Sequence, residues 1–211
     1  MSKPLTDAEL QAKLDADQQR RNMIIERYRR AESPLLDELR AVGVNVRTAW
    51  DLREWQKPYR SAIPILIKHL TRDYPANVRK GIAMALARKW ARELAWEELI
   101  KIYSMEPNLS GPAPEGEIGA PDEPKAQMAV SISEMAKPED LHELIELLEN
   151  TKNGVSRVLL VRKVARSRSQ YAFETLARLS SDPDLKEEVA QVLKSKLRRQ
   201  AKKLGPHVAR T

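Results

Sequence analysis

The sequence predicts an all-α protein, an α-solenoid of about four helical hairpins with an N-terminal helical cap. Four stretches place apolar residues at i, i+3, i+4 and i+7, which is the spacing of one buried helix face. Helix-forming residues dominate the composition, and no run alternates with the period of two that a strand requires. Each stretch precedes a second apolar helix, so each pair buries its apolar face only by packing on its neighbours.

The four stretches mark the first helix of each expected pair. The second stretch starts 33 residues after the first and the third starts 45 residues after the second, which implies an insertion between them. Segment 107–124 has five prolines and three glycines, and it is therefore expected to be an exposed loop. The apolar positions are Ile63, Leu66, Ile67 and Leu70; Trp96, Leu99, Ile100 and Tyr103; Leu141, Leu144, Ile145 and Leu148; and Ala172, Thr175, Leu176 and Leu179.

Helix signals place the remaining elements in order. Thr6 and Glu9 form a capping-box pattern, which predicts a helix from 6 to about 31. Ser33-Pro34 predicts a second, separate helix that ends at Gly43. The first pair is expected at 60–72 and 76–91, the third at 138–149 and 153–168, and the fourth at 170–180 and 184–203. We therefore divide the chain into an arm and capping segment at 1–59, a repeat domain at 60–203 and a tail at 204–211.

Composition excludes several classes of site. The chain has no cysteine, which rules out disulfides, thiolate nucleophiles and cysteine-ligated metals. The three histidines lie far apart in the sequence, so we expect no metal site and no cofactor. The N-terminal region is charged and no apolar run is long enough to span a bilayer, so we expect a cytoplasmic protein with no membrane contact.

Several segments resemble the HEAT repeat. Residues 62–70 form an apolar helix with an early proline, Asp73 stands in the following turn, Val78-Arg79 opens the next helix and residues 83–87 end it with alanine and leucine. Gly154 to Arg157 with Val164-Ala165, and residues 181–184 with Val189, are similar. The resemblance covers roughly residues 60–200. It implies that second helices line a concave, ligand-facing side, but it implies no reaction.

Charge suggests what this face would bind. Residues 111–150 carry ten acidic and two basic side chains, whereas residues 151–211 carry five acidic and fifteen basic ones. The expected second helices contain no acid between residues 76 and 92 or between 153 and 168. A basic groove attracts an anionic partner. The candidate ligand-binding residues are Arg79, Lys80, Arg88, Arg157, Arg162 and Arg166.

Each candidate also has a structural interpretation. In HEAT proteins an arginine at the position of Arg79 and Arg157 commonly pairs with a turn acid of an adjacent repeat, and Asp73 and Asp182 are available. Charged residues on an exposed helix face are usually only solvated. The basic run from Lys194 to Lys203 could hold phosphates or acidic protein, but it also suits a helix C-terminus.

The sequence leaves two functions open. The first is a non-catalytic scaffold whose basic face recognises an acidic protein partner. The alternative is binding of DNA or RNA, with the alkylpurine DNA glycosylases as an enzymatic analogy, since those are small, basic and HEAT-like and use tryptophans near an acid. Trp50 with Asp51 or Glu54 is the loosely similar grouping here. No catalytic residue is predicted.

Overall fold

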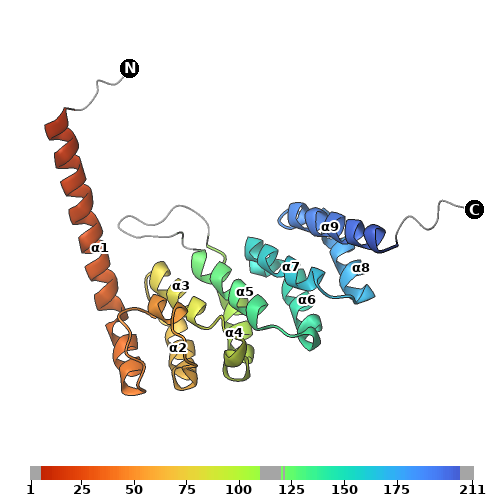
Figure 1. Ribbon diagram of the computed structural model, residues 1–211, viewed down its shortest axis with the longest axis horizontal. Helices are drawn as coiled ribbons and strands as arrows, with labels where there is room; N and C mark the ends of the chain where they lie inside the picture. Colours follow the sequence, from red (N-terminus) through yellow and green to blue (C-terminus); the bar gives the residue numbers. More distant parts are fainter. Residues whose placement is uncertain (1–5, 110–119, 121, 205–211) are drawn as a thin grey trace, which may run out of the picture.

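The structure is a computed structural model that describes residues 6–109, 120 and 122–204, with side chains up to residue 198. Within these ranges the chain forms nine α-helices connected by loops and 3₁₀ turns, and no strand (Figure 1). The expected loop at 107–124 and the tail at 204–211 lie largely outside the described residues. The helices are α1 (Asp7–Ala41), α2 (Ile63–Leu70), α3 (Ala76–Ala85), α4 (Arg92–Met105), α5 (Glu123–Met135), α6 (Leu141–Glu149), α7 (Val158–Ala165), α8 (Gln170–Arg178) and α9 (Lys186–Leu204).

Helices α2 to α9 form four consecutive pairs in which each helix contacts its partner: α2 with α3, α4 with α5, α6 with α7, and α8 with α9. The second helices also contact one another in order, α3 with α5, α5 with α7 and α7 with α9 (Figure 1). The expected ranges for the first, third and fourth pairs fall on these helices, with 3₁₀ turns at several of the predicted helix starts. All-α architecture is therefore confirmed.

The core is built from the predicted apolar stripes. Most of the sixteen positions are buried, and Ile67, Ile100, Leu141 and Leu179 are half-buried at the edge of the same cluster. Burying one such side chain contributes about 1.5–3 kcal/mol. The stripes of successive pairs merge into one cluster that runs from Tyr28 to Val189, which is why the pairs hold together although each helix is short.

Helix α1 corrects one expectation. The chain was expected to break at Ser33-Pro34, but α1 continues through Pro34 to Ala41. Proline costs a helix one backbone hydrogen bond, and here Leu35 and Leu39 are completely buried on the following turns. Tertiary packing therefore overrides the local start signal. The predicted start at Thr6 and the predicted stop at Gly43 are confirmed, since Thr6 and Glu9 form the capping box and Gly43 follows the helix with φ +83°. The expected end at about residue 31 is wrong.

The N-terminal part of α1 projects away from the other helices (Figure 1). Residues 7–23 are exposed apart from the half-buried Asp17, and Leu10, Leu14 and Met23 are among the exposed apolar side chains. Ile24 is half-buried against the core, and full burial starts at Tyr28. The arm that the sequence predicts is thus the first half of a helix whose second half is anchored.

A 3₁₀ helix, η1 (Ala49–Arg53), joins α1 to the pairs. Thr48 stands at the N-terminal end of this turn, but its side chain makes no capping hydrogen bond. The buried carboxylate of Glu32 instead accepts a hydrogen bond from the Ala49 N–H at 2.5 Å. Trp50 donates its indole N–H to the carbonyl of Asn77 on α3, at 3.2 Å. The N-terminal segment is thereby attached to the first pair.

Candidate anion-binding site

Arg157 is one of six predicted binding residues, and the structure buries it. It lies just before α7 and is 1% exposed. Its guanidinium donates to Asp182 at 2.8 Å, to Asp184 at 3.1 Å and to the carbonyl of Leu148 at 3.1 Å. Hydrogen bonds from Arg157 lower the pKa of the Asp182 carboxyl below its ordinary value. This arginine holds the third pair against the fourth, as the structural interpretation expected.

Arg79 plays the corresponding part on α3, although with a different acid. It donates through Nη1 and Nη2 to the two oxygens of Glu106, at 2.6 and 2.5 Å. Its Nε–H donates to the carbonyl of Leu70 at 3.1 Å. The expectation that Arg79 pairs with Asp73 is therefore wrong. In both cases the arginine donates to a carbonyl near the end of the first helix of its own pair. It also donates to an acid that follows the first helix of the next pair.

Three more candidates are bonded within the chain. Lys80 lies 3.0 Å from Glu123 and 5.9 Å from the centre of a Trp50 ring. Arg88 donates to the carbonyls of Leu52 and Arg53, at 2.9 and 2.6 Å. Arg162 is exposed and donates its Nε–H to Glu188 at 2.5 Å, a contact that raises the pKa of the guanidinium.

Arg166 is the remaining candidate, and it belongs to a group of unpaired cations. It follows α7 directly, next to Lys163 and Arg168. None of these three side chains forms an ion pair within 4.0 Å or a hydrogen bond with any described residue. The C-terminal end of α7 therefore concentrates three cations that no described carboxylate contacts, although Glu134 and Asp140 act on Lys163 from farther away.

These cations line a cleft of about 460 Å³ between α6 and α7, which we call the α6–α7 cleft. Its floor is apolar, and no carboxylate lines it. Lys137, on the opposite wall, lies 3.8 Å from Glu139, which is outside the lining. The lining residues are Lys137, Pro138, Leu141, Leu144, Lys163, Arg166, Ser167 and Arg168.

Electrostatics in this cleft favour an anion. Burial lowers the pKa of the Lys163 ammonium and the positive charge of Arg166 lowers it further, against the opposing effect of the Glu134 and Asp140 carboxylates. The first two causes disfavour the charged form, and a bound anion would oppose both. Cations at the end of α7 also interact favourably with the helix dipole, so part of their arrangement serves the helix itself.

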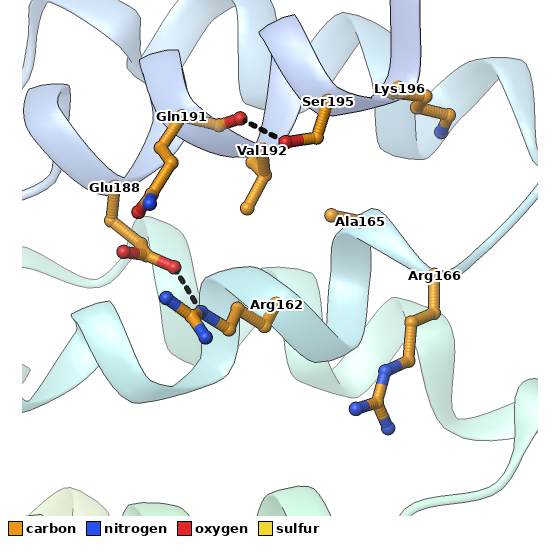
Figure 2. Close-up of a pocket in the computed structure, with 8 residues that line it drawn as sticks. All are labelled: Arg162, Ala165, Arg166, Glu188, Gln191, Val192, Ser195 and Lys196. Atoms are coloured by element: carbon orange, nitrogen blue, oxygen red, sulfur yellow. Dashed lines mark hydrogen bonds and ion pairs between the residues drawn. The ribbon is translucent and has the colours of Figure 1, made fainter. Parts of the chain in front are cut away.

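A second cleft lies on the other side of α7. This α7–α9 cleft has a volume of about 320 Å³. Figure 2 shows the Arg162 guanidinium turned toward Glu188 of α9, whereas the guanidinium of Arg166 points away from α9; Gln191 and Lys196 line the cleft from the α9 side. Arg166 lines both clefts, and the ammonium of Lys196 donates to the carbonyl of Ser167 at 2.9 Å. The two clefts therefore meet at the C-terminal end of α7.

Acidic residues gather elsewhere, in a cleft of about 520 Å³ between α4 and α6. Trp96 is buried there as predicted, and its indole N–H donates to Glu143 at 2.7 Å. Arg92 pairs with the buried Asp140 in the same region. The remaining acids that line this cleft are Glu93, Glu97, Glu98 and Glu139. Basic and acidic surfaces are thus separated on the two sides of the α6 N-terminus.

The grouping of Trp50 and Asp51 lies at the junction of α1, η1 and α3. Both residues line a cleft of about 310 Å³ together with Glu32. Asp51 accepts a hydrogen bond from the backbone N–H of Arg47 at 3.0 Å, and Trp50 is bonded to Asn77. Both side chains therefore make structural contacts within the chain.

The sequence reasoning missed part of the site. Lys137, Lys163 and Arg168 line the cleft but are not among the six predicted binding residues, and Leu141 and Leu144 are predicted only as buried apolar positions. One signal was present: residues 153–168 contain no acid that could pair with these cations locally.

Among the described residues, no group of three or more histidine, aspartate or glutamate side chains could hold a metal ion. No described helix is long and apolar enough to cross a membrane. Comparisons of this chain with known protein families, with curated proteins and with solved structures found no match.

Proposed function

We propose that this protein is a non-catalytic scaffold that binds an acidic segment of a protein partner in the α6–α7 cleft. The observation that carries the proposal is the lining of that cleft, in which Lys137, Lys163, Arg166 and Arg168 surround an apolar floor without a carboxylate. Among the described residues only Lys137 of these four has an ion-pair partner, Glu139. The net positive charge of the lining attracts acidic ligands and increases their association rate.

The apolar floor favours a protein partner. Pro138, Leu141 and Leu144 offer contact to aliphatic side chains, and the core of a protein interface is more apolar than its rim. No aromatic side chain lines the cleft, although single-stranded nucleic acids are commonly held by stacking on aromatic rings.

The scaffold itself is proposed to be a HEAT-like α-solenoid. Two observations support this: the second helices contact one another in order, and Arg79 and Arg157 make equivalent ties between neighbouring pairs. A solenoid presents an extended surface to its partner. In this protein the basic surface would lie towards the C-terminal end of that array.

A second candidate function, binding of nucleic acid, has its own observation. Lys194 and Arg198 are exposed and lie one turn apart on α9, and two cations on one helix face can contact neighbouring phosphates. The affinity would then depend steeply on salt and little on the apolar floor.

Fluorescence anisotropy distinguishes the two functions. A labelled peptide rich in Glu and Asp that contains two leucines, a duplex DNA and a single-stranded RNA are titrated with the protein across a salt series. We expect the peptide to bind, and Arg168→Glu to weaken it about tenfold because one attraction becomes a repulsion. Lys152→Glu is the matched control, since Lys152 is exposed on another turn and lines neither cleft.

The outcomes separate clearly. If Arg168→Glu and Lys152→Glu bind the peptide equally, with helicity unchanged in circular dichroism, the α6–α7 cleft is not the site. Tight binding of DNA or RNA with a steep salt dependence, and none of the peptide, would replace the proposal by the second candidate.

A further inference from the structure

We infer that one extended acidic segment crosses the C-terminal end of α7 and occupies both clefts, with its apolar residues in the α6–α7 cleft and a polar, acidic stretch in the α7–α9 cleft. This inference rests on the proposed function and adds the path and the composition of the ligand.

Continuity of the two clefts is the first argument. Arg166 lines both of them. Lys196 lines the α7–α9 cleft, and its ammonium donates to the carbonyl of Ser167, a residue that lines the α6–α7 cleft. Arg166 and the contact between Lys196 and Ser167 therefore form a shared cationic rim. A bound chain can pass over this rim without leaving a positively charged surface.

The second argument is that the two clefts offer different chemistry. The α6–α7 cleft has the apolar floor, whereas the α7–α9 cleft presents hydrogen-bond donors and one carboxylate, Glu188, which is paired with Arg162. Arg162 uses its Nε–H for Glu188, while its Nη1 and Nη2 atoms make no hydrogen bond with described residues (Figure 2). The side-chain amide of Gln191 is also unbonded and exposed. Carboxylates and backbone carbonyls of a ligand fit these donors.

The required length follows from the spacing of helices. Packed helices lie about 8–10 Å apart, so a path from α6 across α7 to α9 covers roughly 20 Å. An extended chain advances about 3.3 Å per residue and needs about six residues for this path. A five-residue peptide is therefore confined to one cleft, whereas a twelve-residue peptide reaches both.

The experiment compares two labelled peptides against single variants of the full chain. The long peptide has twelve residues, with two adjacent leucines near one end and Glu or Asp elsewhere. The short peptide has five residues, the same two leucines flanked by Glu. Arg168→Glu changes only the α6–α7 cleft, and Gln191→Glu changes only the α7–α9 cleft. Lys152→Glu again serves as the control, and circular dichroism verifies that each variant is folded.

We expect Arg168→Glu to weaken both peptides about tenfold, and Gln191→Glu to weaken only the long one, by about threefold. If the long peptide is sensitive to Arg168→Glu but not to Gln191→Glu, the bridging path is wrong while the proposed function stands. If neither variant affects either peptide, the proposed function fails as well.

Discussion

The guanidinium of Arg157 and the carboxylate of Asp182 meet at 2.8 Å, and this contact joins the start of α7 to the turn after α8. The arginine is 1% exposed and also donates to Leu148 and Gly154 carbonyls on its own pair. A charge in this position is stable only because every direction of the guanidinium is satisfied. The contact thus links two helix pairs through one side chain.

Removing this side chain should be strongly destabilising. We expect Arg157→Ala to lower the free energy of unfolding by roughly 3–5 kcal/mol, because a buried ion pair loses one partner. Urea denaturation followed by circular dichroism measures the change. Arg178→Ala is the control, since Arg178 pairs with Glu149 at the surface and is 59% exposed. The control should cost about 1 kcal/mol or less, and equal losses would contradict a special role of Arg157.

Glu32 should make stability depend on pH. Burial raises the pKa of its carboxyl from 4.5 to about 7, while the hydrogen bond from Ala49 acts in the opposite direction. At a pH between 4.5 and about 7, the Glu32 carboxyl is protonated in the folded state and ionised in the unfolded state. The contribution of Glu32 to the free energy of unfolding therefore decreases as pH rises through this range. Over this range the loss is about 3 kcal/mol. Glu32→Gln keeps the acceptor for Ala49 and removes the titration, so the variant should be the more stable protein at pH 8.

The measurement is the difference in the free energy of unfolding between the wild type and Glu32→Gln, taken at intervals from pH 4 to 8. Burial lowers the pKa of the His69 imidazole, and a lowered pKa makes stability fall as pH decreases. That contribution is present in both proteins and cancels in the difference. A difference that does not change with pH would show that the Glu32 carboxyl keeps its ordinary pKa.

Gly154 should not tolerate a side chain. Its φ of +62° and ψ of −154° belong to a region that only glycine adopts readily. An added Cβ would lie 2.6 Å from Cγ of Asn108, whose amide donates to the carbonyl of Lys152. We expect Gly154→Ala to cost about 2–3 kcal/mol. Gly43→Ala, at φ +83° with no neighbour within 4 Å of the added atom, should cost only about 1 kcal/mol. Thermal denaturation of both variants provides the comparison.

Pro34 should lower the stability of α1, and replacing it should stabilise the protein. It is exposed inside the helix and supplies no N–H. Pro34→Ala should stabilise the protein by about 2 kcal/mol, since alanine restores the donor and has a much higher helix propensity. Urea midpoints measure this change. A decrease in stability would mean that proline stabilises the protein mainly by restricting the unfolded chain.

The position of the helices could be predicted because local patterns determine it. The helical spacing around Leu66, Leu99 and Leu144 predicts the buried face of each helix, and Thr6 and Gly43 mark the ends of α1. Pro34 shows the limit of such patterns, since packing of Leu35 and Leu39 outweighs a local break.

Pairing across the chain could not be predicted. Arg79 has Asp73 six residues before it in the sequence, yet it pairs with Glu106, 27 residues away. The cleft likewise combines Lys137 from a turn with Arg168 from beyond α7. A one-residue change in helix length alters such distances by several ångströms in space, and sequence spacing does not resolve them.

The two halves of α1 have different access to solvent although they belong to one continuous helix. Most of the stability of a helix in a protein comes from tertiary packing, so the exposed residues before Ile24 should open and close on their own. Their amide hydrogens should exchange with deuterium much faster than those around Leu35 and Leu39. A gradient of exchange along one helix would then mark how far the body of the protein holds its own N-terminus in place.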